Sequence, residues 1–306
     1  MDAILTLYEG DYHYGVGALI NSALAAGFSG RFVVGFRDAL PPWTAALMCE
    51  GECEYVIANA RISFYQEDPP RHLGFHKPFA ALSVFDRYPD IDTVHYADPD
   101  ITFLAPWSFF SQWSKHGIGV VQDANFYEIA LNHPWRHEWE QIIRIAGRNI
   151  EESADTKYPN GGYFSATRQR LPFLEIWRDV TIAFEQNSGD TRQYQMRNRW
   201  KAVVSDQDLL AASLMVWSGS VSLLGREAMG FSGYLFILAH AIESQKPWAA
   251  GYLRNALRGM VPSRAAAEYL KAANRFIRTT NRWRAFWRVL DYRTGQLVTR
   301  FYRRGI

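Results

Sequence analysis

The sequence predicts an α/β protein built on a mainly parallel sheet flanked by helices. Short apolar runs alternate along the chain with longer segments in which apolar residues recur at helical spacing. Strands that alternate with helices of about 10–15 residues form βαβ units, whose strands run parallel. The composition agrees, because 48% of the 306 residues are hydrophobic and a chain of this length can bury a full core.

Seven apolar runs are the expected strands. Residues 3–7 form the first, and the helix that follows over residues 15–26 stops at Gly27. The other expected strands cover residues 31–36, 54–58, 61–65, 93–97, 117–122 and 161–167.

Helical spacing predicts five further helices. They cover residues 41–48, which begin with a proline near the first turn, and residues 76–87, 135–147, 171–186 and 206–216. The polar stretch 187–201 separates the last two of these helices. We expect it to be a mobile loop that covers a site.

The two cysteines, Cys49 and Cys53, are spaced for one face of a helix and have no second pair or histidine nearby. Two reduced thiols in a cytoplasmic protein are the simplest interpretation. No apolar run approaches the roughly 18 residues of a membrane span. The first residues lack the basic region and the cleavage site of a signal peptide, so we expect a cytoplasmic protein.

The net charge of +2 is unevenly distributed along the chain. Residues 271–306 carry ten Lys and Arg against one acid, Asp291, which leaves +9 on this segment and −7 on the first 270 residues. We predict a main domain over residues 1–255 and a basic helical tail over residues 256–306. An asymmetry of this size predicts that the tail meets an anionic surface.

The tail also has an amphipathic pattern. Pro262 and Ser263 can begin a helix, and apolar or small residues then recur in steps of four and three. They predict one continuous helix with a stripe of Tyr269, Ala273, Phe276, Thr280, Trp283, Trp287 and Leu290. A basic helix that carries tryptophans suits an anionic membrane leaflet, here the inner face of the plasma membrane.

Two alternatives compete with membrane binding by the tail. The helix can pack on the main domain or on a second copy of the chain, and the oligomeric state stays open. Nucleic acid is disfavoured as a partner, because the rest of the chain is acidic and would repel its phosphates.

A candidate metal site follows the strand over residues 93–97. Asp98 and Asp100 come directly after this strand, where ligands of parallel sheets bind. With the distant His240 they predict a site for Mn²⁺ or Mg²⁺, and Lys246 can reach a diphosphate beside it. The plain interpretation is a polar turn, a core histidine and a solvated lysine.

Two later segments offer polar groups to a ligand. Asn-Gly-Gly at 160–162 combines an amide with glycines that permit close backbone approach, or it is a simple turn. Ser-Asp-Gln-Asp at 205–208 begins a helix, but a capping serine explains only part of this run. The Tyr-His-Tyr run at 12–14 places aromatic rings after the first strand, where one can stack on a nucleobase.

Taken in order, these motifs resemble the GT-A glycosyltransferases, most closely glycosyltransferase family 8, which includes glycogenin and bacterial lipooligosaccharide galactosyltransferases. The resemblance spans about residues 3–250, and its most specific part is the spacing His240-x5-Lys246-Pro-Trp. It implies a Rossmann-like GT-A catalytic domain over residues 1–255. It implies metal ligation by Asp98, Asp100 and His240, and nucleotide-sugar binding by Leu5, Thr6, Tyr14, Lys77, Asp98, Asn160, Gly161 and Lys246. It also implies that Asp206 and Gln207 are the catalytic residues, with one of them stabilising the transferred sugar on its β face.

The resemblance therefore implies a metal-dependent enzyme that moves a sugar from a nucleotide sugar, expected to be a UDP-sugar, to an acceptor. The acceptor is expected to be a saccharide or a lipid-linked glycan in bacterial surface glycan synthesis, and the anomeric configuration is retained. Two alternatives stay open. Asp98-Pro-Asp-Ile-Thr102 also fits a haloacid-dehalogenase-type phosphatase with Asp98 as nucleophile, and a degenerate transferase domain can serve as a non-catalytic membrane adaptor.

Overall fold

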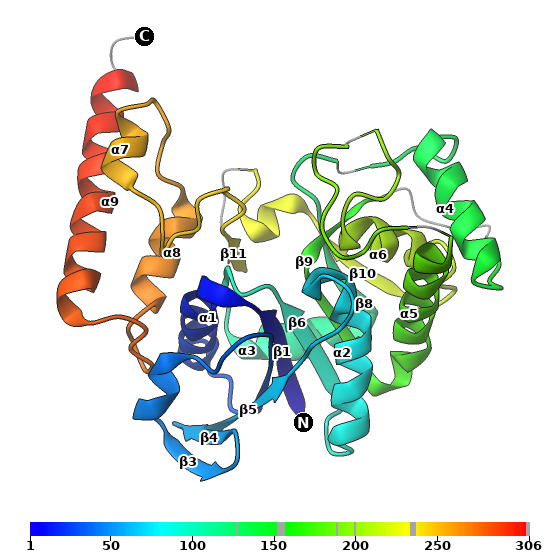
Figure 1. Ribbon diagram of the computed structural model, residues 1–306, viewed down its shortest axis with the longest axis horizontal. Coiled ribbons are helices and arrows are strands. Elements are labelled where there is room, and N and C mark those ends of the chain that lie inside the picture. The colour runs from blue at the N-terminus through cyan, green and yellow to red at the C-terminus, as the bar shows by residue number, and fades with distance from the viewer. Residues whose placement is uncertain (127, 152–156, 188, 199, 233–236, 304–306) are drawn as a thin grey trace.

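The computed structural model describes residues 1–126, 128–151, 157–187, 189–198, 200–232 and 237–303. Within these ranges a nine-stranded sheet runs through the molecule, and helices cover both of its faces (Figure 1). The strand order is β10-β8-β9-β6-β1-β2-β5-β4-β3. The predicted class, an α/β protein with a mostly parallel central sheet flanked by helices, is confirmed.

Parallel pairing holds the centre of the sheet together. β1 (Asp2–Tyr8) lies between β2 (Arg31–Phe36) and β6 (Thr93–Ala97) and pairs in parallel with both. β2 also pairs in parallel with β5 (Ala60–Gln66). β1, β2 and β6 are almost entirely buried, as expected for strands that helices cover on both faces.

Antiparallel strands lie toward the two edges of the sheet. β9 (Pro159–Thr167) runs antiparallel between β6 and β8 (Ile118–Gln122), and β10 (Val221–Leu224) is parallel to β8. At the other edge β5, β4 (Glu54–Ile57) and β3 (Met48–Gly51) form an antiparallel meander. Seven of the nine strands therefore run in one direction, and β9 and β4 run in the other.

The sheet separates two large apolar cores. One core lies under α2 (Leu73–Arg87), α4 (Pro134–Ile145), α5 (Leu171–Gln186) and α6 (Asp206–Leu214), and the other under α1 (His13–Ala25) and α3 (Trp107–Trp113). Successive side chains of β1 point to opposite faces of the sheet. Leu5 and Leu7 therefore lie in the first core, and Ile4 and Tyr8 lie in the second.

All seven predicted strands form, and helices occupy five of the six predicted positions. α2 begins earlier than predicted, at Leu73, because the His72 side chain accepts a hydrogen bond from the Gly74 backbone N–H (3.0 Å) and caps the helix. The predictions left out several short elements, among them α3, β7 (Ile101–Phe103), β10 and β11 (Leu238–His240).

The predicted helix over residues 41–48 is wrong. Only a short 3₁₀ turn forms, over Pro42–Ala46, and the chain then enters β3. The two cysteines therefore do not share a helix face: Cys49 lies in β3, and Cys53 lies in the following turn with a left-handed φ of 59°. Pairing of β3 with β4 satisfies backbone groups that a helix would otherwise satisfy internally.

The single continuous helix predicted for the tail is wrong. The tail contains α8 (Arg264–Ala272) and α9 (Arg282–Arg303), and α7 (Tyr252–Ala256) precedes them at the end of the main domain. Asn21 of α1 holds the break between α8 and α9: its amide donates to the carbonyls of Ala272 and Ile277 (2.8 Å each) and accepts from the backbone N–H groups of Phe276 and Ile277 (3.0 and 2.6 Å). These bonds replace helical bonds across residues 273–281.

The tail packs on the main domain through α8 and on α7 through α9. Asp291, the single acid of residues 271–306, accepts hydrogen bonds from the backbone N–H groups of Tyr252 and Leu253 at the start of α7 (2.8 and 3.0 Å). A side chain at Gly295 would lie 2.8 Å from the Tyr252 carbonyl oxygen, so glycine permits this close helix contact. Among the described helices, none combines the length and apolar content that crossing a membrane requires.

We predict that Asn21→Ala destabilises the folded protein by about 1–3 kcal/mol, because it leaves buried backbone groups of residues 272–277 without partners. Urea unfolding measures this effect. Asn132→Ala, at an exposed asparagine, is the matched control and should change the free energy of unfolding little. Equal stability of the two variants would show that Asn21 does not hold the tail.

Candidate metal centre

The candidate site forms where β6 ends and the chain turns into β7. The backbone N–H of Asp98 donates to the Gly162 carbonyl of the neighbouring β9 (2.8 Å), which fixes the start of this turn. β7 then pairs antiparallel with β11, and this register sets His240 opposite Ile101. The two-stranded pairing therefore brings His240 beside the Asp-x-Asp segment from 140 residues further along the chain.

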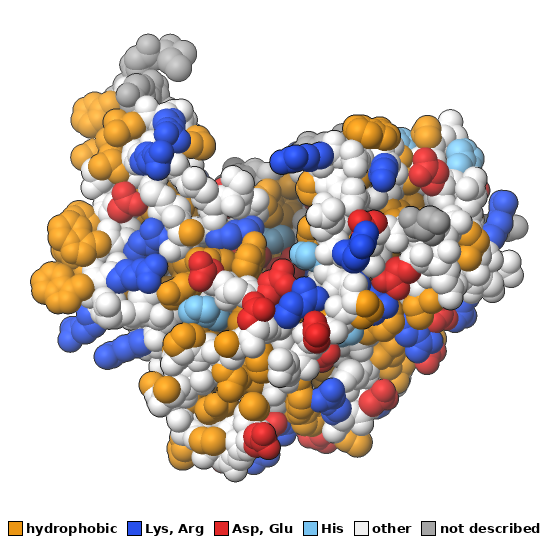
Figure 2. Space-filling view, in the orientation of Figure 1, with side chains coloured by type: hydrophobic (Ala, Val, Ile, Leu, Met, Phe, Trp, Pro, Cys, Tyr) orange, Lys and Arg blue, Asp and Glu red, His pale blue; other side chains and the backbone are white. Residues whose placement is uncertain are grey.

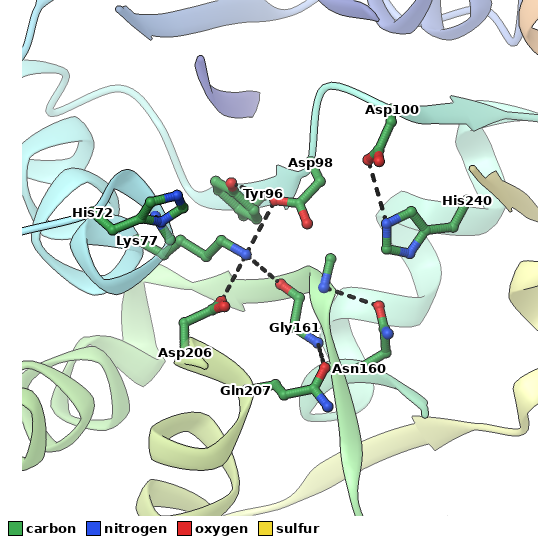
Figure 3. Close-up of polar contacts among 12 residues, drawn as sticks. His72, Lys77, Tyr96, Asp98, Asp100, Asn160, Gly161, Asp206, Gln207 and His240 are labelled. Carbon is green, nitrogen blue, oxygen red and sulfur yellow. Dashed lines mark hydrogen bonds and ion pairs between the residues drawn. The ribbon is translucent and has the colours of Figure 1, made fainter. Parts of the chain in front are cut away.

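The side chains of Asp98, Asp100 and His240 converge (Figure 3). One ligand atom from each lies within 4.8 Å of the other two. Asp100 Oδ1 lies 3.3 Å from His240 Nε2, and Asp100 Oδ2 accepts from Lys246 Nζ at 2.7 Å. Burial by itself raises the pKa of Asp100, but His240 and Lys246 outweigh it and hold the pKa below its usual range. Asp100 is therefore a carboxylate.

Lys246 is held at this centre by two acceptors. Its ammonium donates to Asp100 and to the Ala241 carbonyl oxygen (2.9 Å). Burial lowers the pKa of Lys246, but Asp100 more than compensates and the pKa is raised. The lysine is thus charged, and it is not the solvated surface residue that its sequence context alone suggested.

His240 is a buried histidine with one nitrogen unused. Its Nδ1 is buried and has no hydrogen-bond partner among the described residues, while Nε2 faces Asp100. A side chain at Gly162 would lie 2.4 Å from His240 Cε1 and 2.9 Å from Nδ1. Glycine at this position is therefore required for the ring to approach β9.

Lys77 is the second cation of the site. Its ammonium is 2% exposed and lies 2.7 Å from Asp206 Oδ2 and 3.1 Å from Asp98 Oδ1, and it donates to the Gly161 carbonyl oxygen (2.8 Å) (Figure 3). Burial lowers the pKa of Lys77, but Asp206 and Asp98 more than offset this and the pKa is raised. The ring of Tyr96 lies 4.8 Å below the ammonium. Lys77 therefore joins four elements of the fold.

The Asn-Gly-Gly segment begins β9 and connects the two halves of the site. Asn160 donates to Asp123 Oδ2 (3.0 Å) and accepts from the Gly162 N–H (3.0 Å), which keeps the segment tightly curved. The Gly161 N–H donates to Gln207 Oε1 at 3.3 Å. The alternative of an isolated turn does not describe this segment, because each of its three residues bonds a side chain of the site or supports one.

The helix start at 205–208 performs two tasks. Ser205 and Asp208 form a capping box, as the plain interpretation expected. Asp206 and Gln207 instead face the site, where Gln207 Nε2 donates to the Tyr158 hydroxyl (3.2 Å). The capping pair therefore fixes the direction in which Asp206 and Gln207 point.

Two ring side chains of the site, Tyr194 and His72, were not predicted from the sequence. Tyr194, from the predicted loop 187–201, donates its hydroxyl to Asp206 Oδ1 (2.6 Å), and its ring lies 4.2 Å from that of His72. Burial lowers the pKa of His72. A single tyrosine in a polar loop carries no pattern that points to α2 and α6, so only the folded chain reveals its place. The mobility of this loop stays a prediction.

The three residues expected to contact a nucleotide lie apart from this network. Leu5 and Thr6 are both 1% exposed within β1, and Thr6 Oγ1 is buried without a hydrogen-bond partner among the described residues. Tyr14 lies at the start of α1, and its hydroxyl accepts from Arg284 of the tail (3.2 Å). Tyr12, two residues earlier, packs edge-on against Trp248 at 5.1 Å. Their contact with a nucleotide stays a prediction.

Comparison with known proteins assigns no family. No protein-family model matches the chain, and a search of curated proteins gives no significant match.

We predict that Asp208 makes folding stability depend on pH. Burial raises the pKa of Asp208 from 3.8 to about 6, so the folded chain binds its proton more tightly than the unfolded chain. The protonated Asp208 therefore contributes to the free energy of unfolding below about pH 4, and this contribution is lost as the pH rises to about 6. The free energy of unfolding of the wild type, minus that of Asp208→Asn, should fall by roughly 1–3 kcal/mol as the pH rises through this window. A difference that stays constant in urea titrations across this range would refute the assignment.

Proposed function

We propose that this protein is a metal-dependent glycosyltransferase of GT-A fold that uses a nucleotide sugar, with UDP as the nucleotide. The observation that carries the proposal is the convergence of Asp98, Asp100 and His240 beside Lys246, at the carboxyl end of a central strand. This arrangement supplies ligands for a cation and a fixed positive charge for a diphosphate.

The residues fit a hard divalent cation. Two carboxylates and one imidazole are a donor set for Mn²⁺ or Mg²⁺ with room for phosphate oxygens. The Nε2 of His240, which faces Asp100, and the glycine that makes space for the ring support a ligand role for this histidine. When bound, such a cation would neutralise negative charge on the diphosphate.

Lys246 and the cation site would together stabilise the leaving group. Departure of a nucleoside diphosphate breaks the bond between the anomeric carbon and a phosphate oxygen, and negative charge develops on that oxygen. An ammonium held between Asp100 and the Ala241 carbonyl is preorganised to meet this charge. With retention of configuration, the departing phosphate can accept the proton of the acceptor hydroxyl, so no strong base is needed.

The side of the site near α6 would hold the transferred sugar. Asp206 is engaged by Lys77 and Tyr194, so its carboxylate is a positioning group here and a weak candidate for a nucleophile. Gln207 is oriented by the Gly161 N–H and the Tyr158 hydroxyl. We place the Gln207 amide at the sugar and Asp206 in support of it.

We predict that Asp100→Asn abolishes Mn²⁺-dependent sugar transfer while the fold stays intact. The amide loses the charge that balances His240 and Lys246 and is a poor ligand for a hard cation. Asp86→Asn, at an exposed aspartate of α2, is the matched control. Turnover is measured over a panel of UDP-sugars, with calorimetry for Mn²⁺–UDP binding and circular dichroism for the fold.

The same experiment separates the alternatives. Full activity of Asp100→Asn in metal-free buffer would contradict the metal-dependent mechanism. Hydrolysis of sugar phosphates by the wild type, lost in Asp98→Asn, would favour the haloacid-dehalogenase-type phosphatase. Binding of Mn²⁺–UDP without turnover of any donor would favour a non-catalytic adaptor.

We also propose that α9 holds the protein on an anionic membrane surface, which would make a lipid-linked acceptor accessible. The outer face of α9 carries exposed apolar side chains: Trp283 74%, Phe286 57%, Trp287 59%, Leu290 40%, Leu297 53% and Phe301 70%. Figure 2 shows apolar side chains along the outer edge of α9 and Lys and Arg side chains beside them. Tryptophans flanked by arginines suit the interface of an anionic leaflet.

We predict that Trp283→Ser combined with Trp287→Ser weakens binding to anionic vesicles at least about tenfold, because two interfacial aromatic anchors are lost. Vesicle sedimentation of the full chain measures this. Trp200→Ser, at a tryptophan 73% exposed outside the tail, is the control and should bind as the wild type does. Unchanged binding of the double variant, with a concentration-dependent change of mass, would favour a second copy of the chain on this face.

A further inference from the structure

A groove lies between α8 and the first turns of α9. Its volume is about 520 Å³. None of its lining residues is acidic and five are basic: Lys271, Arg278, Arg282, Arg284 and Arg288. Lys271 is paired with Glu268, and the four arginines make the groove attract anions.

Two arginines of the groove have no acidic partner in the part of the chain that the structure describes. The side chains of Arg278 and Arg282 are exposed, and neither makes an ion pair or side-chain hydrogen bond with the described residues. Arg284 and Arg288 are held instead, by the Tyr14 hydroxyl and by the carbonyls of residues 247 and 250. The groove thus combines fixed positive charges with two guanidinium groups that are free to bind an anion.

One wall of the groove is apolar. Leu270, Ala285, Phe286 and Val289 offer carbon surface beside the arginines. A free phosphate ion would use none of this surface, whereas an amphiphilic anion would use both parts. Phe286 also belongs to the exposed apolar face of α9, so the groove opens onto the face that we propose lies on the membrane.

The ring of Trp248 lies between the groove and the segment that leads to the metal centre. Trp248 lines the groove and packs against Tyr12, and a side chain at Gly15 would lie 2.9 Å from Trp248 Cζ3 and 2.3 Å from the carbonyl oxygen of Pro99. Trp248 and the start of α1 therefore lie between the groove and the Asp98–Asp100 turn.

We infer that this groove binds the phosphate head group of a lipid, with Arg278 and Arg282 on the phosphate and the apolar wall along the adjoining lipid chain. One part of the inference rests on the proposed glycosyltransferase function: the bound lipid phosphate is assigned as the acceptor of the sugar. The phosphate would anchor the acceptor at the groove, and its glycan would extend past Trp248 toward the metal centre.

The test uses the full chain and vesicles of two compositions with matched surface charge. One contains phosphatidylcholine with phosphatidic acid, which exposes a phosphomonoester, and the other contains phosphatidylcholine with phosphatidylserine. The wild type should bind the phosphatidic acid vesicles at least about tenfold more tightly, the factor expected for one charge-assisted hydrogen bond. Equal binding to both compositions would overturn the inference.

Two double variants separate recognition by the groove from general attraction by charge. Arg278→Gln with Arg282→Gln should lose the preference for phosphatidic acid. Arg293→Gln with Arg300→Gln removes the same charge from exposed positions of α9 outside the groove and should keep the preference. If the groove variant keeps the preference, the inference fails. Both variants must retain the thermal melting temperature of the wild type, as expected for exposed side chains.

Competition identifies the source of the phosphate. Glycerol phosphate and inorganic phosphate should compete weakly, because they make no contact with the apolar wall. Full competition by inorganic phosphate at low concentration would show a site for free phosphate and overturn the lipid assignment. These measurements need no turnover, so their failure is distinct from failure of sugar transfer. A vesicle preference without any transfer would overturn the proposed function and leave the groove assignment in place.

Discussion

The site depends on one buried ammonium group. Lys77 extends from α2 and contacts Asp98 after β6, the Gly161 carbonyl of β9 and Asp206 of α6. A buried charge without partners is costly, and removal of one member of such a group typically costs about 3–5 kcal/mol. These four segments must therefore keep their relative positions for the lysine to be paired. The ladder between β6 and β9 and the capping box at the start of α6 hold the partners of this lysine in place.

Charge balance extends from Lys77 through the rest of the candidate centre. Asp98 is paired with Lys77, and Asp100 with both His240 and Lys246, so each carboxylate has a cationic neighbour. A divalent cation between these carboxylates would repel Lys246, and a diphosphate would attract it. Binding of the cation and of the anionic ligand should therefore be coupled, because each compensates the electrostatic cost of the other.

The tail is joined to the main domain by polar bonds and by buried apolar contacts such as that of Tyr269 with Trp248. Asn21 binds the turn between α8 and α9, and Asp291 caps α7. These bonds orient α9 so that Tyr292 and Thr299 are buried while its tryptophans remain exposed. The apolar stripe predicted over residues 269–290 is consequently divided: Tyr269 and Ala273 are buried in a small core, and Trp283, Trp287 and Leu290 face outward.

The sequence by itself determined the alternation of strands and helices, because burial on both faces of a parallel sheet leaves local apolar runs in the chain. It also indicated Asp98, Asp100, Asn160 and His240 as one candidate site, since their residue types and order form a pattern. The tertiary structure alone decided which side chains meet. β11 carries three residues and offers no periodicity, yet its pairing with β7 brings His240 to Asp100. The break in the tail has a similar origin. Helical spacing continues through residues 273–281, but the amide of Asn21, about 250 residues away, competes with the helix for backbone groups of this segment, together with the nearby side chains of Asn274 and Thr279.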